Sequence, residues 1–220
     1  MINITYFVHG TTTDNEEDIS SGWKDVGLSE LGVRQSIELK ENIKDKKFDV
    51  VFCSDLKRAV DSAKIVFEGA PIIADIRLRE CNYGKFNGKS SLIVEPMQEK
   101  NITESFPEGE SCEDVKNRIA DFLEFLHQNY DGNPRTQRAE QSSHDGNPRT
   151  QRAEQSSHDG NPRTQRAEQS SHDGKHVAIV SHKAPQLALD VLLKGKTWEQ
   201  AFAEDWRKTK AWRPGWEYTL

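Results

Sequence analysis

Several kinds of segment are missing from this sequence, and each absence narrows what the chain can be. No run approaches the roughly 18 apolar residues that a membrane span needs, and the N-terminus lacks the basic stretch and apolar run of a secretory signal. No Lys/Arg-dense run occurs and the formal net charge is −6, which argues against nucleic acid or an anionic membrane as the main partner. We therefore expect a cytoplasmic chain, with room for a local basic site that binds a small anion.

Cysteine and hydrophobic residues are also scarce. Cys53, Cys81 and Cys112 are an odd number and do not have the spacing of metal ligands, so a reduced chain is the simplest interpretation. Hydrophobic residues make up 34% of the chain, which is low for a packed domain. The 220 residues are enough for one domain with a core, so some segment must dilute its composition.

The diluting segment is a tandem repeat. The sequence DGNPRTQRAEQSSH occurs three times without change, at 131–144, 145–158 and 159–172, and is followed by Asp-Gly. Each copy has a single apolar residue, so the copies cannot stack through hydrophobic faces as solenoid repeats do. We expect residues 131–174 to be a flexible, solvated insertion, which loop-closure entropy tolerates. It is either a neutral loop expansion or an arm that binds a partner or oligomerises.

Each copy of the repeat ends on a histidine, at His144, His158 or His172. Evenly spaced histidines could bind a metal. Nothing beyond the repetition supports this interpretation, so we predict no metal site.

Outside the insertion, strand patterns alternate with helix patterns. Strands are expected at 2–8, 48–54, 71–76 and 176–181, and helices at 29–44, 55–67, from Ser111 onward and around 187–192. The runs at 48–54 and 176–181 are continuously apolar, as in strands buried on both faces of a parallel sheet. Ser29 and Ser111 are the expected helix N-caps, the latter with Asp114 in a variant capping box. This order predicts an α/β fold with a mostly parallel sheet, in a single domain over 1–220.

Polar residues stand where three of these strands end. His9 follows the first strand, Arg58 lies one turn into the helix after the second, and His182 follows the last. Because ligands of such sheets bind beyond the C-terminal strand ends, these three side chains should share one crevice. An imidazole can attack phosphorus, and a guanidinium binds phosphate oxygens bidentately. A carboxylic acid can protonate the leaving oxygen, and Glu80 is the candidate for that role.

These motifs resemble those of the histidine phosphatase superfamily, the phosphoglycerate-mutase-like enzymes, over about 1–130 and 175–195. The matching segments are HGTTTDNE, GLSELGVRQS, SDLKRAVDSA, LRECNYGKFNG, FPEGESCEDVKNRI and VAIVSH. The resemblance implies a three-layer sandwich and no metal or organic cofactor. It also implies catalytic roles for His9, Glu80, His182 and Arg58. Three residues of the opening motif, Gly10, Thr12 and Asn15, are the implied substrate-binding group.

Two positions depart from the family pattern. Val8 stands where the family has an arginine before the nucleophilic histidine, and Lys183 stands where it has a glycine after the second histidine. The first change removes a phosphate ligand and the second adds a cation beside the pocket. One hypothesis is that Lys183 replaces part of the lost charge as a flexible point charge, and so binds substrate. The alternative is that Lys183 points to solvent and the site is degraded.

Two other patterns fail and one is ambiguous. Only three residues separate Gly84 from Gly88, whereas a phosphate-cradling Gly-Lys-Ser loop needs four, and no G-x-S-x-G elbow is present. The tail, 196–220, is rich in tryptophan, and Trp198, Phe202 and Trp206 have the spacing of one helical face. We expect this face to pack on the domain, while a lid or dimer contact is the alternative.

The leading prediction is a phosphomonoester hydrolase that acts on a small phosphorylated substrate through a phosphohistidine intermediate. Two alternatives stay open, a phosphoglycerate-mutase-type phosphotransferase and a weakly active or inactive phosphate-ligand-binding or scaffold protein. We predict no nucleic-acid or membrane partner, and the sequence leaves a homodimer open.

Overall fold

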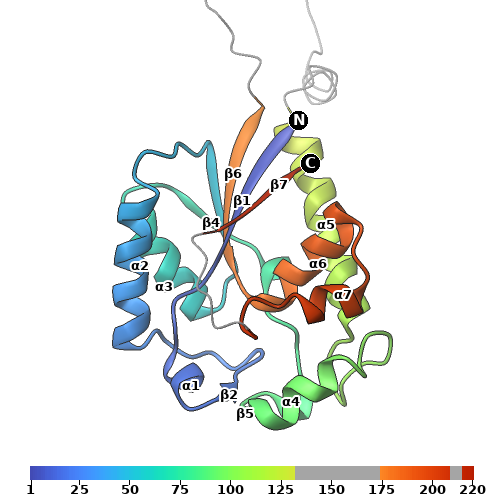
Figure 1. Cartoon of the computed structure of the whole chain (residues 1–220). Helices are drawn as coiled ribbons and strands as arrows, with labels where there is room; N and C mark the ends of the chain where they lie inside the picture. The colour runs from blue at the N-terminus through green and yellow to red at the C-terminus, as the bar shows by residue number, and fades with distance from the viewer. Residues whose placement is uncertain (132–173, 209–214) are drawn as a thin grey trace, which may run out of the picture.

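The central feature of the molecule is a sheet of five strands, shown by a computed structural model that describes residues 1–131, 174–208 and 215–220 (Figure 1). In spatial order the strands are β4 (Ile72–Ala74), β3 (Val50–Cys53), β6 (Lys175–Ser181), β1 (Ile2–Val8) and β7 (Trp216–Thr219). The first four run parallel, and β7 runs antiparallel to β1 at one edge. The predicted α/β fold with a mostly parallel sheet is therefore confirmed.

Helices cover both faces of the sheet and make three layers (Figure 1). One face carries α2 (Glu30–Asn42) and α3 (Lys57–Val66), and the other carries α5 (Cys112–Tyr130), α6 (Lys183–Lys194) and α7 (Trp198–Ala203). Successive side chains of β1 point to opposite faces of the sheet. Tyr6 packs in the cluster that includes α5 and α6, and Phe7 packs in the cluster that includes α2 and α3. Burial on both faces explains the continuous apolar runs in the strand sequences.

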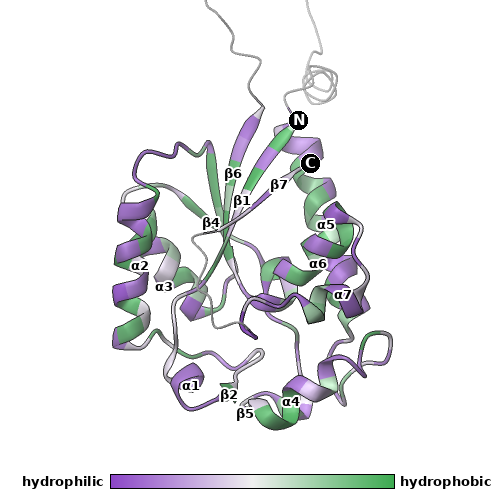
Figure 2. Ribbon diagram, in the orientation of Figure 1, coloured by the Kyte–Doolittle hydropathy of each residue, from purple (hydrophilic) through white to green (hydrophobic). Residues whose placement is uncertain are grey.

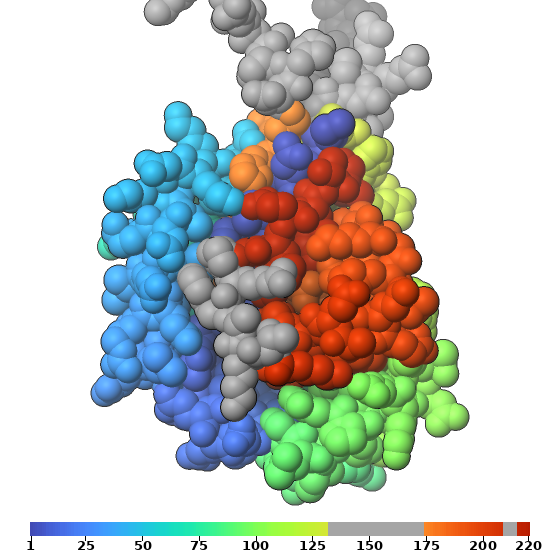
Figure 3. Space-filling model, in the orientation of Figure 1, coloured from blue at the N-terminus to red at the C-terminus, as the bar shows by residue number. Residues whose placement is uncertain are grey.

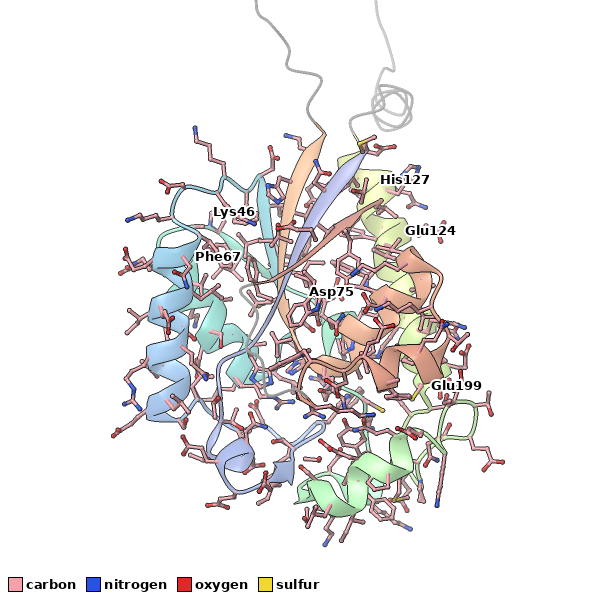
Figure 4. All side chains as sticks on the ribbon, viewed as in Figure 1. Lys46, Phe67, Asp75, Glu124, His127 and Glu199 are labelled. Atoms are coloured by element: carbon pink, nitrogen blue, oxygen red, sulfur yellow. The ribbon has the colours of Figure 1, made fainter. Side chains whose placement is uncertain are left out.

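The distribution of polar residues follows the layers. Apolar residues occupy much of the central strands, whereas the outer sides of the surrounding helices are mostly hydrophilic (Figure 2). Figure 4 shows Glu124 and His127 on the outer side of α5 and Glu199 on the outer side of α7, and all three are exposed. Within the described ranges, no helix is both long enough and apolar enough to cross a membrane.

Two helices begin where the sequence predicted. The Ser29 side chain accepts a hydrogen bond from the Gly32 amide at the start of α2. At the start of α5, the Ser111 hydroxyl accepts from the Asp114 amide at 3.1 Å and the Asp114 carboxylate accepts from the Ser111 amide at 2.8 Å. This reciprocal pair is a capping box with aspartate as the acidic member.

The apolar residues of α2 divide into buried and exposed sets. Leu39 and Ile43 are buried against the sheet and α3, whereas Val33 is 37% and Ile37 51% exposed. The helical spacing of both pairs is as expected, but only one of them reaches the core. The reason is that α2 lies outside α3 and meets the core with a narrow face.

Short elements surround the C-terminal ends of the parallel strands. They are α1 (Thr13–Glu16), β2 (Ile19–Ser20), β5 (Lys89–Ser90), α4 (Ser91–Gln98) and the 3₁₀ turns Ile76–Leu78 and Gly84–Phe86. β2 and β5 pair antiparallel in a separate two-stranded sheet. In Figure 1, α1, β2, β5 and α4 lie below the central sheet, at the end where β1 and β6 finish.

The repeat segment lies almost wholly outside the described residues, so the predictions made for 131–174 and its histidines stay predictions. Its attachment points are described. Asp131 follows α5 and forms an ion pair with the amino group of Met1, and Gly174 precedes β6 and also lies against Met1. Both therefore adjoin the start of β1, at the opposite end of the strand from His9.

The tail contains one strand that the sequence analysis missed, β7, which pairs with β1. The expected helical face is shorter than its spacing suggested. Trp198 and Phe202 are buried on α7 with stacked rings 5.8 Å apart, but α7 ends at Ala203, so Trp206 lies beyond it. The Trp206 ring instead lies 5.8 Å from that of Trp216 on β7.

Candidate active site

The end of β1 presents His9. Its backbone amide continues the strand ladder by donating to the Ser181 carbonyl at 3.0 Å. The ring Nδ1 lies 2.7 Å from the Gly10 carbonyl oxygen, which can only accept, so Nδ1 carries the hydrogen and Nε2 carries the lone pair. Burial and the neighbouring Arg58 cation lower the pKa of His9 to about 3. The ring is therefore neutral at ordinary pH, with Nε2 available as a nucleophile.

Gly10 fixes the turn that follows His9. A Cβ at this position would lie 2.4 Å from the Gly32 carbonyl oxygen, so no side chain fits between the loop and α2. The Gly10 amide donates to the Ser62 hydroxyl at 2.9 Å, and its carbonyl holds the His9 ring. Gly10 thus orients His9, and its expected contact with substrate stays a prediction.

Arg58 approaches His9 from the first turn of α3. Its Nε donates to His9 Nε2 at 3.3 Å, and its other nitrogens donate to the carbonyls of Lys24 at 3.0 Å and Gly22 at 2.7 Å. The side chain is buried, and this burial lowers the pKa of its guanidinium. The two backbone carbonyls hold the guanidinium in place beside the nucleophile. Three of its five N–H groups are engaged, which leaves two for a ligand.

His182 follows β6 and is the N-cap residue of α6. The Tyr6 hydroxyl accepts from the His182 amide at 3.0 Å and donates to its carbonyl at 2.6 Å, which fixes the backbone. The ring lies 4.9 Å from that of His9, between centroids. Burial, with Arg58 and His9 adding, lowers the pKa of His182 well below its ordinary value.

Both ring nitrogens of His182 are buried and have no hydrogen-bond partner among the residues that the structure describes. Buried polar atoms are nearly always paired, because leaving them unpaired is unfavourable. A neutral imidazole has one nitrogen that donates and one that accepts, so the His182 ring beside His9 has an N–H that requires an acceptor. An oxyanion that accepts a hydrogen bond from the ring meets that requirement.

Glu80 lies over the start of α6, next to His182. Its Oε1 accepts from the amides of Cys81 at 2.8 Å and Ala184 at 3.1 Å. Its backbone carbonyl accepts from Trp23 Nε1 at 2.7 Å and Arg118 Nη2 at 3.0 Å. Main chain and side chain are both anchored, so the carboxyl group has a defined place beside the start of α6.

The structure therefore brings His9, Arg58, His182 and Glu80 to one end of the sheet. Thr12 and Asn15 lie in the loop after His9, where they form the capping box of α1. Asn15 Oδ1 accepts from the Thr12 amide and Thr12 Oγ1 accepts from the Asn15 amide, both at 3.1 Å. Thr12 is fully buried, and the roles expected of these two residues in substrate binding stay predictions.

Lys183 is buried and Val8 is partly buried. Val8 packs against the apolar cluster of the sheet. Lys183 is 7% exposed, its Nζ donates to Gln98 Oε1 at 2.8 Å, and it lies 3.2 Å from Asp205 Oδ2. The alternative in which Lys183 points to solvent is wrong. Its amine already has a carboxylate partner, so the hypothesis that it binds substrate needs that pair to open.

Sequence reasoning missed the supporting residues. Tyr6 carried a signal, because a tyrosine on the buried face of a strand must find a partner for its hydroxyl. Ser62, Trp23 and Arg118 carried none, since their partners are backbone groups far away in the sequence. No group of three or more His, Cys, Asp or Glu side chains in residues 1–131, 174–208 and 215–220 is arranged to hold a metal ion.

Known proteins resemble this chain in sequence. The model of the histidine phosphatase superfamily (branch 1) matches residues 6–136. The probable fructose-2,6-bisphosphatase TIGAR A of Danio rerio is 33% identical over 136 residues, which are 57% of this chain and 53% of that protein. A 2,3-bisphosphoglycerate-dependent phosphoglycerate mutase of Streptococcus pneumoniae is 34% identical over 97 residues, 41% of this chain and 42% of that protein. The chain thus matches about half of these relatives, or less.

Solved structures resemble it in fold. A mycobacterial glucosyl-3-phosphoglycerate phosphatase in complex with VO3 superimposes with a TM-score of 0.66 at 21% identity, and the match covers 91% of this chain and 86% of that one. At this identity the likeness supports the fold alone. The sequence match to the family model includes His9, Arg58 and Glu80, whereas His182 lies beyond it and is placed by β6.

Proposed function

The chain belongs to the histidine phosphatase superfamily (branch 1), and from this premise we propose that it is a phosphomonoester hydrolase acting on a small phosphorylated substrate through a phosphohistidine intermediate. The superfamily and the 33% identical bisphosphatase relative support a phosphatase-type activity. One observation carries the proposal for this chain. The neutral His9 ring, with Nε2 beside Arg58, lies against the unpaired ring nitrogens of His182.

In the first step His9 Nε2 attacks phosphorus, and the bond from phosphorus to the leaving oxygen breaks. Glu80, as the carboxylic acid, gives its proton to that oxygen. The two unengaged N–H groups of Arg58 and the ring of His182 hold the phosphoryl oxygens while negative charge shifts onto the leaving group. The loop with Gly10, Thr12 and Asn15 completes the pocket in this proposal.

In the second step the Glu80 carboxylate takes a proton from water, and that water attacks phosphorus. The phosphorus–nitrogen bond breaks, phosphate leaves and His9 returns to its neutral form. The two steps together require no reactant other than the phosphorylated substrate, these residues and water. In a mutase a second substrate oxygen would replace water, as the name of the streptococcal relative suggests. The acceptor in the second step separates the two activities.

The test is turnover of phenyl phosphate between pH 5 and 8 by the wild-type protein, by His9→Ala and by His127→Ala. His127 is an exposed histidine on the outer side of α5 and serves as the matched control. We expect His9→Ala to lose about 10³-fold or more and the control to keep its rate. Rapid alkaline quenching should trap the phosphoryl group on His9. Equal rates in the wild-type protein and His9→Ala would overturn the proposal in favour of a phosphate-binding module.

The remaining predictions about the cell are proposals of the same kind. We infer from composition a cytoplasmic location and no nucleic-acid or membrane partner. A homodimer stays open.

A further inference from the structure

Arg58 is a single cation, and a phosphoryl group bound beside His9 would need more positive charge than Arg58 alone provides. A phosphoryl group carries up to two negative charges and presents three oxygens. Arg58 has already engaged three of its five N–H groups, two of them on backbone carbonyls. Val8 carries no charge and packs, partly buried, against the core, and the amine of Lys183 is paired with Asp205. A second cation would have to come from elsewhere in the chain.

The segment after α7 supplies a candidate, Arg207. Asp205 is buried, and its Oδ2 lies 3.2 Å from Lys183 Nζ and 3.6 Å from Arg207 Nε, while its Oδ1 accepts from the Arg207 amide at 3.0 Å. Because Lys183 directly follows His182, Asp205 ties Arg207 to the start of α6. In Figure 3 the red-orange region of α7 and the residues after it lies against the green α4, and the ion pairs of Arg207 with Glu95 and of Lys208 with Glu99 link this segment to α4.

The charge of Arg207 acts on the reacting groups, in agreement with the position that its contacts with Asp205 give it. After burial and Arg58, Arg207 also contributes to the lowered pKa of His9. Burial of the Arg207 guanidinium lowers its pKa, but the negative charges of Asp205 and Glu95 raise it by more. Tyr83 and Glu80 act in the same direction, so the pKa of Arg207 is raised. Arg207 therefore stays charged, and its field reaches both His9 and Glu80.

The guanidinium of Arg207 is only partly engaged. Its Nη2 donates to Glu95 Oε1 at 2.7 Å, and that carboxylate is about half exposed. Its Nε is buried and makes no hydrogen bond with the described part of the chain. Because Glu95 is about half exposed, water weakens its ion pair with Arg207, so an oxyanion that offers several oxygens can replace Glu95. Asp205 meanwhile keeps the side chain oriented.

We propose that Arg207 binds the phosphoryl group of the substrate. It supplies the second guanidinium that this site lacks because residue 8 is valine rather than arginine. Asp205 is its positioning residue. The inference rests on the proposed function, because the bound anion is the phosphoryl group that His9 accepts. It goes beyond that function in assigning a substrate-binding residue to the C-terminal segment.

The direct test compares Arg207→Ala, Arg207→Lys and Lys208→Ala. Lys208 is an exposed cation next to Arg207 in the sequence and is the matched control. Calorimetry would give the dissociation constants for inorganic phosphate and orthovanadate, beside kcat/KM for phenyl phosphate. We expect Arg207→Ala to raise both dissociation constants and to lower kcat/KM, each by about 10- to 100-fold. Lys208→Ala should change each of these values less than about twofold. Arg207→Lys should fall between, because lysine keeps the charge but loses the planar fork.

A second experiment tests whether an arginine at position 8 can replace Arg207 in binding phosphate. Val8→Arg should raise phosphate affinity more in the Arg207→Ala background than in the wild-type protein, since the two guanidinium groups substitute for one another. Far-ultraviolet circular dichroism would verify folding of every variant. If Val8→Arg does not fold, the comparison of Arg207→Ala with Arg207→Lys decides alone.

Two outcomes would overturn the inference. One is wild-type affinity for phosphate and orthovanadate in Arg207→Ala. The other is a loss seen with 4-carboxyphenyl phosphate but not with phenyl phosphate, which would assign Arg207 to the leaving group. The arms also separate this inference from the proposed function. Binding of phosphate that depends on Arg207, in a protein whose turnover does not depend on His9, would keep the anion site and reject the phosphatase.

Discussion

Arg58 Nε lies 3.3 Å from His9 Nε2, so the cation of the site points at the atom that would attack phosphorus. This contact favours a neutral imidazole and places guanidinium N–H groups where phosphoryl oxygens would lie. We predict that Arg58→Ala lowers kcat/KM for phenyl phosphate by about 10²- to 10³-fold and raises the pKa of His9. Steady-state kinetics and an NMR titration of the ring measure the two effects. Lys57→Ala, an exposed neighbour on the same helix, should change neither, and an unmoved His9 pKa in Arg58→Ala would contradict the electrostatic part.

Glu80 should matter most for substrates with poor leaving groups. An alkoxide must be protonated as it departs, whereas 4-nitrophenolate leaves readily without help. We predict that Glu80→Gln lowers kcat/KM for an alkyl phosphate by about 10²- to 10⁴-fold and for 4-nitrophenyl phosphate much less. The glutamine oxygen can still accept from Ala184, so the loop should keep its shape. Glu99→Gln, at an exposed position, is the control, and an equal loss on both substrates would count against Glu80 as the acid.

Lys183 should contribute to stability rather than to phosphate affinity. Its buried amine is the hydrogen-bond partner of Gln98 and the ion-pair partner of Asp205. Removing one member of a buried ion pair leaves the other charge poorly compensated, so we predict that Lys183→Met lowers the free energy of unfolding by about 3–5 kcal/mol. Urea denaturation measures this loss, and exposed Lys89→Ala should stay within about 0.5 kcal/mol. Strongly weakened phosphate binding at unchanged stability would instead restore Lys183 as the replacement cation.

Acid should destabilise the protein through His9 and His182 before it protonates most carboxylates. Burial lowers both pKa values in the folded chain, to about 3 for His9, from an ordinary value of 6.5. Below pH 6.5 the unfolded chain therefore binds protons that the folded chain does not. The free energy of unfolding consequently decreases as the pH is lowered. Each histidine contributes up to about 1.4 kcal/mol per pH unit in this window.

Urea denaturation at pH 7.5, 6.0 and 5.0 tests this expectation, because Asp and Glu remain largely ionised over that range. His182→Gln should reduce the dependence on pH, while exposed His127→Gln should leave it close to that of the wild-type protein. The same slope in His182→Gln and wild type would show that His182 is not held neutral by the fold.

Local patterns in the sequence predicted the order of most strands and helices, the start of α5 at Ser111 and the polar residues at the strand ends. These features are readable because they depend on local spacing. A strand buried on both faces is apolar throughout, a cap requires a serine at one position, and parallel strands finish at a common edge. His9, Arg58 and His182 could therefore be assigned to one crevice from the chain alone.

The positions of the charges around these residues follow instead from contacts between segments that are distant in the sequence. Lys183 adjoins His182 in the sequence, yet its amine pairs with Asp205, and Arg207, 25 residues beyond His182, pairs with the same carboxylate. The pairing of β7 with β1 and the exposure of Ile37 were decided in the same way. Burial and charge pairing depend on which segments meet in space, and no local periodicity encodes contacts between such distant residues.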